Sequence, residues 1–227
     1  MADEARSPLR VWWDTPAGGA ENMARDEALA EEAERREAVL VRLSSWERPE
    51  VSLGAFQSLA EAQASGALAG LPIFRRPSGG GAIVHGSDLT LAIAVPRGDR
   101  FAANARVLYD LVHDALVDEL RTRGIGAFRS AGEPDRDGKL LCFDRRAEGD
   151  VVVGRGAGDG GDDKIFGSAQ RRLRGVVLQH GSLLLAASAG VPAEARHPGL
   201  EEVATPGGPW RRPGLEEVVG GWLGRIA

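Results

Sequence analysis

Apolar residues of this 227-residue chain fall mostly into short runs, and some of these runs alternate with polar residues. Alternation with a period of two is typical of β-strands, because successive side chains point to opposite faces. Val51, Leu53 and Ala55 show that period. We expect strands at 38–44, 49–55, 72–75, 82–84, 88–95, 151–153, 164–170 and 176–185. We expect the strands at 82–84 and 88–95 to pair with each other. The strands at 164–170 and 176–185 are expected to flank a turn at 171–175.

Longer segments predict the helices. The clearest is 103–123, which Gly124 is expected to end. Its expected buried face consists of Val107, Leu108, Leu111, Val112, Ala115, Leu116 and Leu120. Segment 22–37 is rich in Ala and Glu and is expected to form a helix that Asn22 caps. Shorter helices are expected at 57–65, ended by Gly66, and at 214–226, where Trp222 and Leu223 dock.

Glycine and proline separate these elements. Residues 154–163 are rich in Gly and Asp without an apolar anchor, so we expect a mobile loop; 190–213 should be a surface excursion. No internal repeat or long linker divides the chain, so residues 1–227 should form one domain, with its core at about 9–190. Residues 191–227 would be a short extension, without an accessory domain. The predicted fold class is α/β (α+β), a mixed β-sheet flanked by helices.

Composition narrows the class of protein. Hydrophobic residues make up 43% of the chain and charged residues 27%, as in ordinary globular proteins. A net charge of -5 gives no basic footprint for nucleic acid. No apolar run could span a bilayer, and the acidic N-terminus lacks a signal-peptide core. One cysteine excludes an internal disulfide framework. These features predict a cytoplasmic protein that binds neither nucleic acid nor membrane.

The strongest chemical signal lies at residues 75–85, which read RRPSGGGAIVH. Three adjacent glycines permit unusual backbone conformations and close approach to a ligand. The two arginines before them can bind a carboxylate or phosphate through planar forks. A hairpin turn with surface arginines would give a similar pattern, but the added histidine between apolar strands favours a small-molecule site. The candidate binding residues are Arg75, Arg76, Ser78, Gly79, Gly80, Gly81 and His85.

Three further positions could carry chemistry. Lys164 opens the run KIFGSAQ, whose small residues Gly167, Ser168 and Ala169 would leave room for a substrate; taken alone, a solvent-exposed lysine on an edge strand explains it better. His180 and Gly181 could line a pocket, although a structural histidine is the simpler reading. Cys142 is either a buried small hydrophobe or a nucleophile assisted by a nearby cation. No metal site is predicted.

Taken together, these segments resemble the lipoate-protein ligase and octanoyltransferase family, whose catalytic domain is shared with biotin-protein ligases. The resemblance runs in order over about residues 9–185. The matching stretches are NMA and DEAL at 22–29, Trp46, Pro49, VSLG and FQ at 51–57, RRPSGGGAIVH at 75–85, and KIFGSAQRRLRGVVLQHGSLLL at 164–185. The sequence departs from the family at Gly86, where the family usually has Asp; Asp88 lies two residues further on.

The resemblance implies a mixed sheet backed by helices, with the acyl chain in a tunnel. The glycine triplet and the two arginines would shape the carboxyl or phosphate end of the ligand. Lys164 would hold the acyl carbonyl, and His85 and His180 would line the pocket.

The family contains two chemistries. Ligases activate lipoate with ATP and Mg as an adenylate, whereas octanoyltransferases take the acyl group from acyl carrier protein through a cysteine thioester and need no cofactor. Cys142-Phe143 resembles the Cys-Phe nucleophile motif of one octanoyltransferase branch, with 154–163 as a hairpin insertion before Lys164. The expected absence of an accessory domain also favours the transferase, with Cys142 and Lys164 as catalytic residues.

The expected partners follow from the same resemblance. Acyl carrier protein would be the donor, and lipoyl domains of 2-oxoacid dehydrogenases or the glycine cleavage H protein the acceptor, with the enzyme a monomer. An ATP-dependent ligase and a non-catalytic lipoyl-domain-binding protein remain alternatives. Carrier proteins and lipoyl domains are typically acidic, so the local basic residues predict a docking patch. Its candidate members are Arg145, Arg146, Arg171, Arg172 and Arg174.

Overall fold

Two β-sheets form the framework of the protein in a computed structural model that describes residues 9–133, 138–154, 161–204, 208 and 214–226. The larger sheet has the strand order β1-β2-β6-β10-β9-β8-β7, and the smaller has the order β4-β3-β5. β1 and β2 are parallel, as are β3 and β4, and the remaining neighbours are antiparallel. The mixed α/β fold expected from the sequence is confirmed.

The elements follow closely the segments with strand or helix periodicity. The strands are β1 (Arg10–Trp13), β2 (Leu40–Ser44), β3 (Glu50–Leu53), β4 (Ile73–Arg75), β5 (Ile83–His85), β6 (Asp88–Val95), β7 (Ala127–Arg129), β8 (Val151–Gly154), β9 (Asp162–Leu173) and β10 (Val176–Leu184). The helices are α1 (Gly19–Arg36), α2 (Leu59–Ala64), η1 (Gly66–Leu68), α3 (Arg100–Ala103), α4 (Ala105–Thr122), η2 (Ala193–Ala195), α5 (Leu200–Val203) and α6 (Gly214–Gly224).

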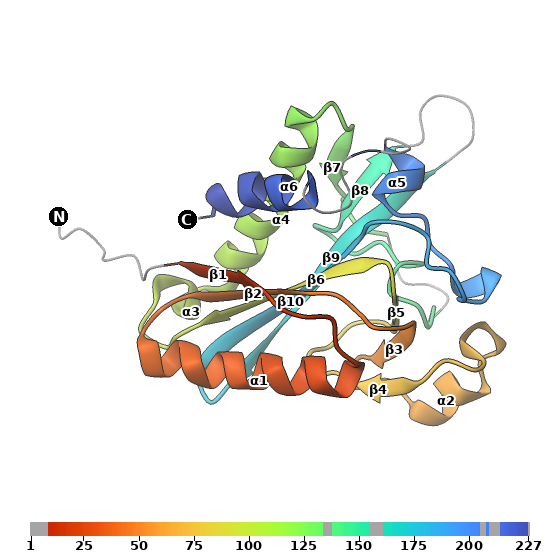
Figure 1. The fold of residues 1–227 in the computed structure, drawn as a ribbon, viewed down its shortest axis with the longest axis horizontal. Helices are drawn as coiled ribbons and strands as arrows, with labels where there is room; N and C mark the ends of the chain where they lie inside the picture. Colours follow the sequence, from red (N-terminus) through yellow and green to blue (C-terminus); the bar gives the residue numbers. More distant parts are fainter. Residues whose placement is uncertain (1–8, 134–137, 155–160, 205–207, 209–213, 227) are drawn as a thin grey trace.

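Helices cover both faces of the large sheet. Figure 1 shows α1 and the small sheet on one side and α4 with α6 on the other. The core on the α4 side is the larger one, and it includes Trp222, whose indole nitrogen donates to Val112 O at 2.9 Å. The predicted docking of Trp222 and Leu223 is therefore confirmed. No described helix is both long and apolar enough to cross a membrane.

One predicted strand pairing is wrong. Strand β5 pairs with β3 in the small sheet, whereas β6 lies in the large sheet between β2 and β10. Both edges of β6 are therefore occupied, and the turn between β5 and β6 carries the chain from one sheet to the other. This crossing places His85 and Asp88 at the junction of the two sheets.

Other boundaries also differ from the prediction. Helix α1 begins three residues earlier, so Asn22 is a buried residue inside it and not its cap. In α4, Val107 is 48% exposed and does not belong to the buried face. Gly124 does follow the helix with a left-handed φ of 79°.

Two predicted loops are more structured than expected. Gly154 belongs to β8, while Asp162 and Asp163 belong to β9; the two strands pair as a hairpin, and 155–160 lie outside the described residues. The expected surface excursion contains η2 and α5 and buries three apolar side chains. Leu200 packs into the core on the α4 side, and Val191 and Ala195 pack against the small sheet. Residues 205–207 and 209–213 also lie outside the described part.

Candidate active site

A cavity of about 200 Å³ lies where the small sheet covers β6, β10 and β9. This is larger than the ~150 Å³ cavity in which an apolar molecule such as benzene can be held. Its walls combine small, apolar and polar side chains. The lining residues include Met23, Trp46, Ser52, Arg76, Ser78, Gly79, Gly80, Gly81, Ile83, His85, Thr90, Tyr109, Cys142, Arg145, Asp150, Lys164, Gly167, Ser168, Ala169, His180, Gly181 and Ser182. Most of the residues predicted from the sequence therefore meet around one space.

Cys142 reaches this cavity on the segment between β7 and β8. Its N–H donates to Ala82 O at 2.7 Å, and the Ala82 N–H donates to Leu140 O at 2.9 Å. The two segments thus form a short bridge through main-chain atoms. A Cβ atom on Gly81 would lie only 2.9 Å from the backbone nitrogen and Cα of Cys142. Glycine is required at position 81 because the cysteine segment packs directly on it.

Lys164 faces the thiol. Its Nζ lies 3.4 Å from Cys142 Sγ and 3.2 Å from Cys142 O, and it forms an ion pair with Asp150 Oδ2 at 2.8 Å. Both partners of the ion pair are buried. The lysine stem crosses Gly167, where a Cβ atom would lie 2.7 Å from Lys164 Cε. An ammonium group in this position can stabilise a thiolate and an oxyanion that forms on a thioester carbonyl.

Asp150 was not predicted from the sequence. Besides Lys164, its carboxylate accepts the N–H of Ala147 at 2.7 Å. It thereby orients the lysine and closes the turn before β8. The available signal was an acidic residue directly before the β-branched run at 151–153. An acidic residue at a buried strand start needs a cationic partner, but the sequence does not show which lysine provides it.

His113 of α4 is a second residue that the sequence did not indicate. Its Nδ1 lies 2.7 Å from Gly149 O, and its Nε2 lies 2.7 Å from Ser168 Oγ. Because a carbonyl only accepts, Nδ1 carries the hydrogen and Nε2 accepts the serine hydroxyl. Burial lowers the pKa of His113 to about 3. The neutral ring therefore connects the Asp150 turn to β9.

This depressed pKa predicts how stability depends on pH. The unfolded chain binds a proton near the ordinary histidine value of 6.5, before the native state does. The free energy of unfolding should therefore decrease as pH falls from about 6.5 towards 3, by at most ~1.4 kcal/mol per pH unit from this group. In His113→Gln the decrease between pH 7 and pH 5 should be smaller. Urea denaturation of both proteins at several pH values measures the free energy of unfolding. An equal dependence on pH in the two proteins would contradict the lowered pKa of His113.

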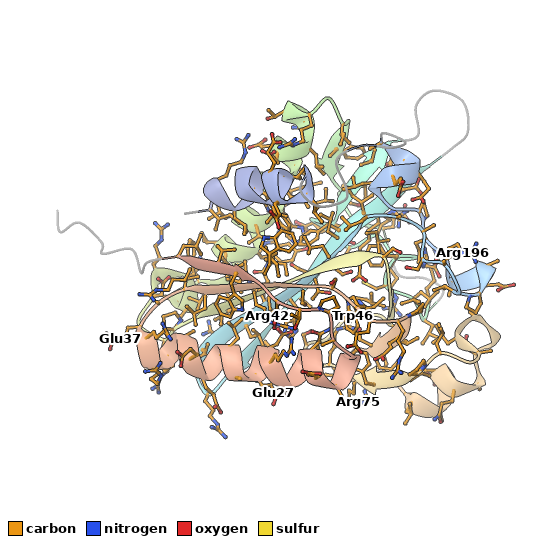
Figure 2. The ribbon with its side chains drawn as sticks, in the orientation of Figure 1. Glu27, Glu37, Arg42, Trp46, Arg75 and Arg196 are labelled. Atoms are coloured by element: carbon orange, nitrogen blue, oxygen red, sulfur yellow. The ribbon has the colours of Figure 1, made fainter. Side chains whose placement is uncertain are left out.

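The two arginines before the glycines have different positions. Arg75, the last residue of β4 (Figure 2), does not line the cavity and donates through Nη1 to Gly54 O and Ala55 O. Arg76 does line the cavity, but its terminal nitrogens donate to Ser52 O, Gly79 O and Gly81 O at 2.7–2.9 Å. In the structure both guanidinium groups thus hold backbone carbonyls. Binding of a carboxylate or phosphate by these groups stays a prediction.

His85 lies in a network at the junction of the sheets. Its Nε2 is 2.8 Å from Ser52 Oγ and its Nδ1 is 2.8 Å from Asp88 Oδ2, while its ring stacks on Trp46. Asp88 thus supplies a carboxylate to His85 although the next residue is Gly86. Burial alone would raise the pKa of Asp88, but His85 and hydrogen bonds from Ser182 and Gly86 hold it below its ordinary value.

His180 lies against a buried charge network. Its Nε2 is 3.1 Å from Asp26 Oδ2, a distance suited to an ion pair although the angle does not meet hydrogen-bond geometry. The other oxygen of Asp26 accepts from Arg42 Nη1 at 2.7 Å, and Asn22 Oδ1 accepts from Nη2 of the same arginine at 2.5 Å. Figure 2 shows Arg42 between α1 and the large sheet. This network fixes one wall of the cavity.

Within the described ranges, no group of three or more His, Cys, Asp and Glu side chains could hold a metal ion. The remaining cation in the wall, Arg145, belongs to the same segment as Cys142.

A family model for the lipoyl protein ligase A/B catalytic domain matches residues 19–196. The chain belongs to this lipoyl protein ligase A/B family. The match includes the glycine segment, Cys142, Lys164 and His180, so all these residues lie in the catalytic domain of the family. The family resemblance inferred from the motifs is confirmed.

Two curated relatives of the chain carry the same name. Octanoyltransferase LipM of Kyrpidia tusciae is 35% identical over 176 residues, which cover 72% of this chain and 61% of the relative. Octanoyltransferase LipM of Symbiobacterium thermophilum is 36% identical over 176 residues, covering 74% of this chain and 61% of the relative. The matched part of the chain thus spans about 61% of the length of these relatives.

Solved structures support the fold. A putative lipoate protein ligase from T. acidophilum with bound lipoic acid aligns with a TM-score of 0.68 at 18% identity, covering 98% of this chain and 86% of that one. Lipoate-protein ligase A bound with ATP gives 0.66 at 19% identity, covering 98% and 84%. Family membership and fold are therefore established independently, by sequence and by shape.

Proposed function

We propose that the protein transfers an octanoyl group from acyl carrier protein to a lysine of lipoyl domains, through a thioester on Cys142. The observation that carries the proposal is the 3.4 Å contact between Cys142 Sγ and Lys164 Nζ at the wall of the cavity. The names of the curated relatives point in the same direction. No ATP is needed, because the donor thioester already contains an activated acyl group.

The reaction has two balanced halves. In the first, the Cys142 thiolate attacks the carbonyl carbon of the donor thioester, and the carrier leaves as a thiolate that takes up a proton. In the second, the acceptor amine attacks the acyl-enzyme, an amide forms, the amine loses a proton, and the Cys142 thiolate is released. Lys164 stabilises the thiolate and both tetrahedral oxyanions, and Asp150 holds the lysine in position.

The rest of the cavity suits an acyl chain. Met23, Trp46 and Ile83 provide apolar surface in its wall. Gly167 of β9 and Gly181 of β10 let the side chains of Lys164 and Phe166 pack closely against these strands. Removing apolar surface from water favours binding by about 25 cal/mol per Å². Two buried polar groups in the wall, His85 and Ser182, already bond to the carboxylate of Asp88. These groups therefore do not require a polar ligand.

Intact-mass spectrometry tests the proposal. After incubation with octanoyl carrier protein, the wild-type mass should increase by one octanoyl group, and hydroxylamine should remove it. Cys142→Ala should acquire no adduct and should not octanoylate an apo-lipoyl domain. A wild-type protein that never acquires the adduct, or an adduct that persists in Cys142→Ala, would refute the proposal.

ATP-dependent ligation is the less well supported alternative. It required Arg75 and Arg76 to bind phosphates together with Lys164, and the guanidinium groups of both arginines donate to backbone carbonyls. Lipoate-dependent release of pyrophosphate that survives Cys142→Ala would favour the ligase.

A further inference from the structure

Phe56 is the most exposed large apolar side chain among the described residues. It is 94% exposed, compared with at most 48% for the other exposed large hydrophobic residues. Single exposed apolar residues are common on protein surfaces and need no explanation by themselves. The surroundings of Phe56 set it apart, because its loop is held rigidly beside the cavity that contains Cys142.

The Phe56 loop, defined here as residues 54–57, is attached at both sides. The Ala55 N–H donates to Ser78 O at 2.9 Å, and the Gln57 side chain donates to Leu140 O at 2.9 Å and accepts from Gly54 N at 3.0 Å. Arg75 holds the loop carbonyls of Gly54 and Ala55 at 2.9 and 3.0 Å. The loop is therefore joined to both the glycine segment and the cysteine segment, while the ring of Phe56 projects from it.

The position of the ring relates it to the cavity. A Cβ atom built on Gly79 would lie 4.0 Å from Phe56 Cε2, and Gly79 itself lines the cavity. A macromolecule that inserts a group into the cavity beside the glycine segment therefore meets the ring. Aromatic side chains on rigid loops are effective binding anchors because they lose little conformational entropy on association.

Three arginines from separate segments contact the Phe56 loop, the cavity or the segment before the glycine triplet. Arg75 borders the Phe56 loop, Arg145 lines the cavity, and Arg171 donates to Pro77 O next to the glycine triplet. The predicted docking patch is divided here, because neighbouring residues of β9 point to opposite faces. Arg172 instead donates to Ala102 O on the α3 side, and Arg174 pairs with Glu31 of α1.

We infer that Phe56 is the anchor of the docking surface for the acceptor domain, a small acidic protein that presents a lysine. This inference rests on the proposed function. A lysine has only a four-carbon stem, so its domain must contact the surface around Cys142 before the amine reaches the thioester. The donor carries its thioester on a much longer flexible arm, so its protein body can remain distant. The three arginines complement an acidic partner.

The two half-reactions separate this role from catalysis. In Phe56→Ala, acylation of Cys142 by octanoyl carrier protein should be unchanged, and so should removal of the octanoyl group by hydroxylamine, which has no domain to dock. Transfer from isolated acyl-enzyme to an apo-lipoyl domain should require about ten-fold more acceptor for half-maximal rate, with the saturating rate unchanged. Arg171→Glu should shift the same midpoint in the same direction. Trp12→Ala is the matched control. Trp12 is 39% exposed and lies on β1, an edge strand of the large sheet, whereas Phe56 follows β3 of the small sheet.

Three outcomes would overturn the inference. An unchanged acceptor midpoint in Phe56→Ala would exclude an anchor, a slowed hydroxylamine reaction would indicate damage to the site, and slowed acylation alone would assign the ring to the donor. Absence of any acyl-enzyme would instead refute the proposed function. In that case, calorimetry of apo-lipoyl domain binding still tests whether Phe56 anchors the docking surface. Equal affinity of the domain for wild type and Phe56→Ala would overturn the inference.

Discussion

Replacing Lys164 by methionine is expected to slow acylation of Cys142 by about 10²–10³-fold, because the variant lacks the ammonium group that stabilises the developing oxyanion in the proposed reaction. Methionine keeps much of the length and apolar character of the lysine stem, which crosses Gly167. Single-turnover acylation followed by intact-mass spectrometry measures the rate. The loss should appear in both half-reactions, since each passes through a tetrahedral oxyanion.

The same substitution leaves Asp150 buried without its cation, and this structural effect needs its own control. The double variant Lys164→Met/Asp150→Asn removes both charges, so it should recover most of the stability while remaining slow. Lys164→Arg retains the charge and should be faster than Lys164→Met. If the double variant recovers its rate together with its stability, Lys164 has a structural role only.

Replacing Arg42 by methionine should lower the free energy of unfolding by about 3–5 kcal/mol, the usual cost of removing one partner of a buried ion pair. Arg42 is 2% exposed and bonds to Asp14, Asn22 and Asp26. Without it, the fully buried Asp26 loses its arginine and keeps the 3.1 Å contact with His180. Chemical denaturation at neutral pH measures the change.

A surface pair provides the comparison for that measurement. Arg36 pairs with Glu32 one turn away on the exposed face of α1, where water and salt screen the pair and leave it little effect on stability. Arg36→Met should therefore have little effect. A loss in Arg42→Met that is equally small would mean that water compensates the buried charges.

Local patterns in the sequence predicted most of the elements but not all their partners. The long strand β6 was recognisable from its nearly continuous apolar run, and β9 and β10 from shorter apolar runs on either side of a turn. Strands β1 and β7 were missed, because segments of four and three residues at the sheet edges carry too little periodicity. The pairing of β5 with β3 was also missed, since strand order depends on packing between distant segments.

The site was predictable where a motif carries it. The glycine triplet was identified from its residue types, and Lys164 and Cys142 through the family resemblance; the structure brings all of them together. Asp150 and His113 were not identified, because each depends on a contact across the sheet that no local pattern encodes. The carbonyl partners of Arg75 and Arg76 were not identified either, because they belong to segments that only the fold brings together.

The attachment of Cys142 has a consequence for how this scaffold can change. Its segment is held to the glycine segment by main-chain hydrogen bonds through Ala82, and these bonds are indifferent to the side chain at position 142. The lysine, its carboxylate partner and the cavity walls belong to separate strands and turns. A substitution at that single position could therefore remove or restore the reactive group without rebuilding the scaffold. Reactivity and architecture are modular here, so the two can diverge independently in evolution.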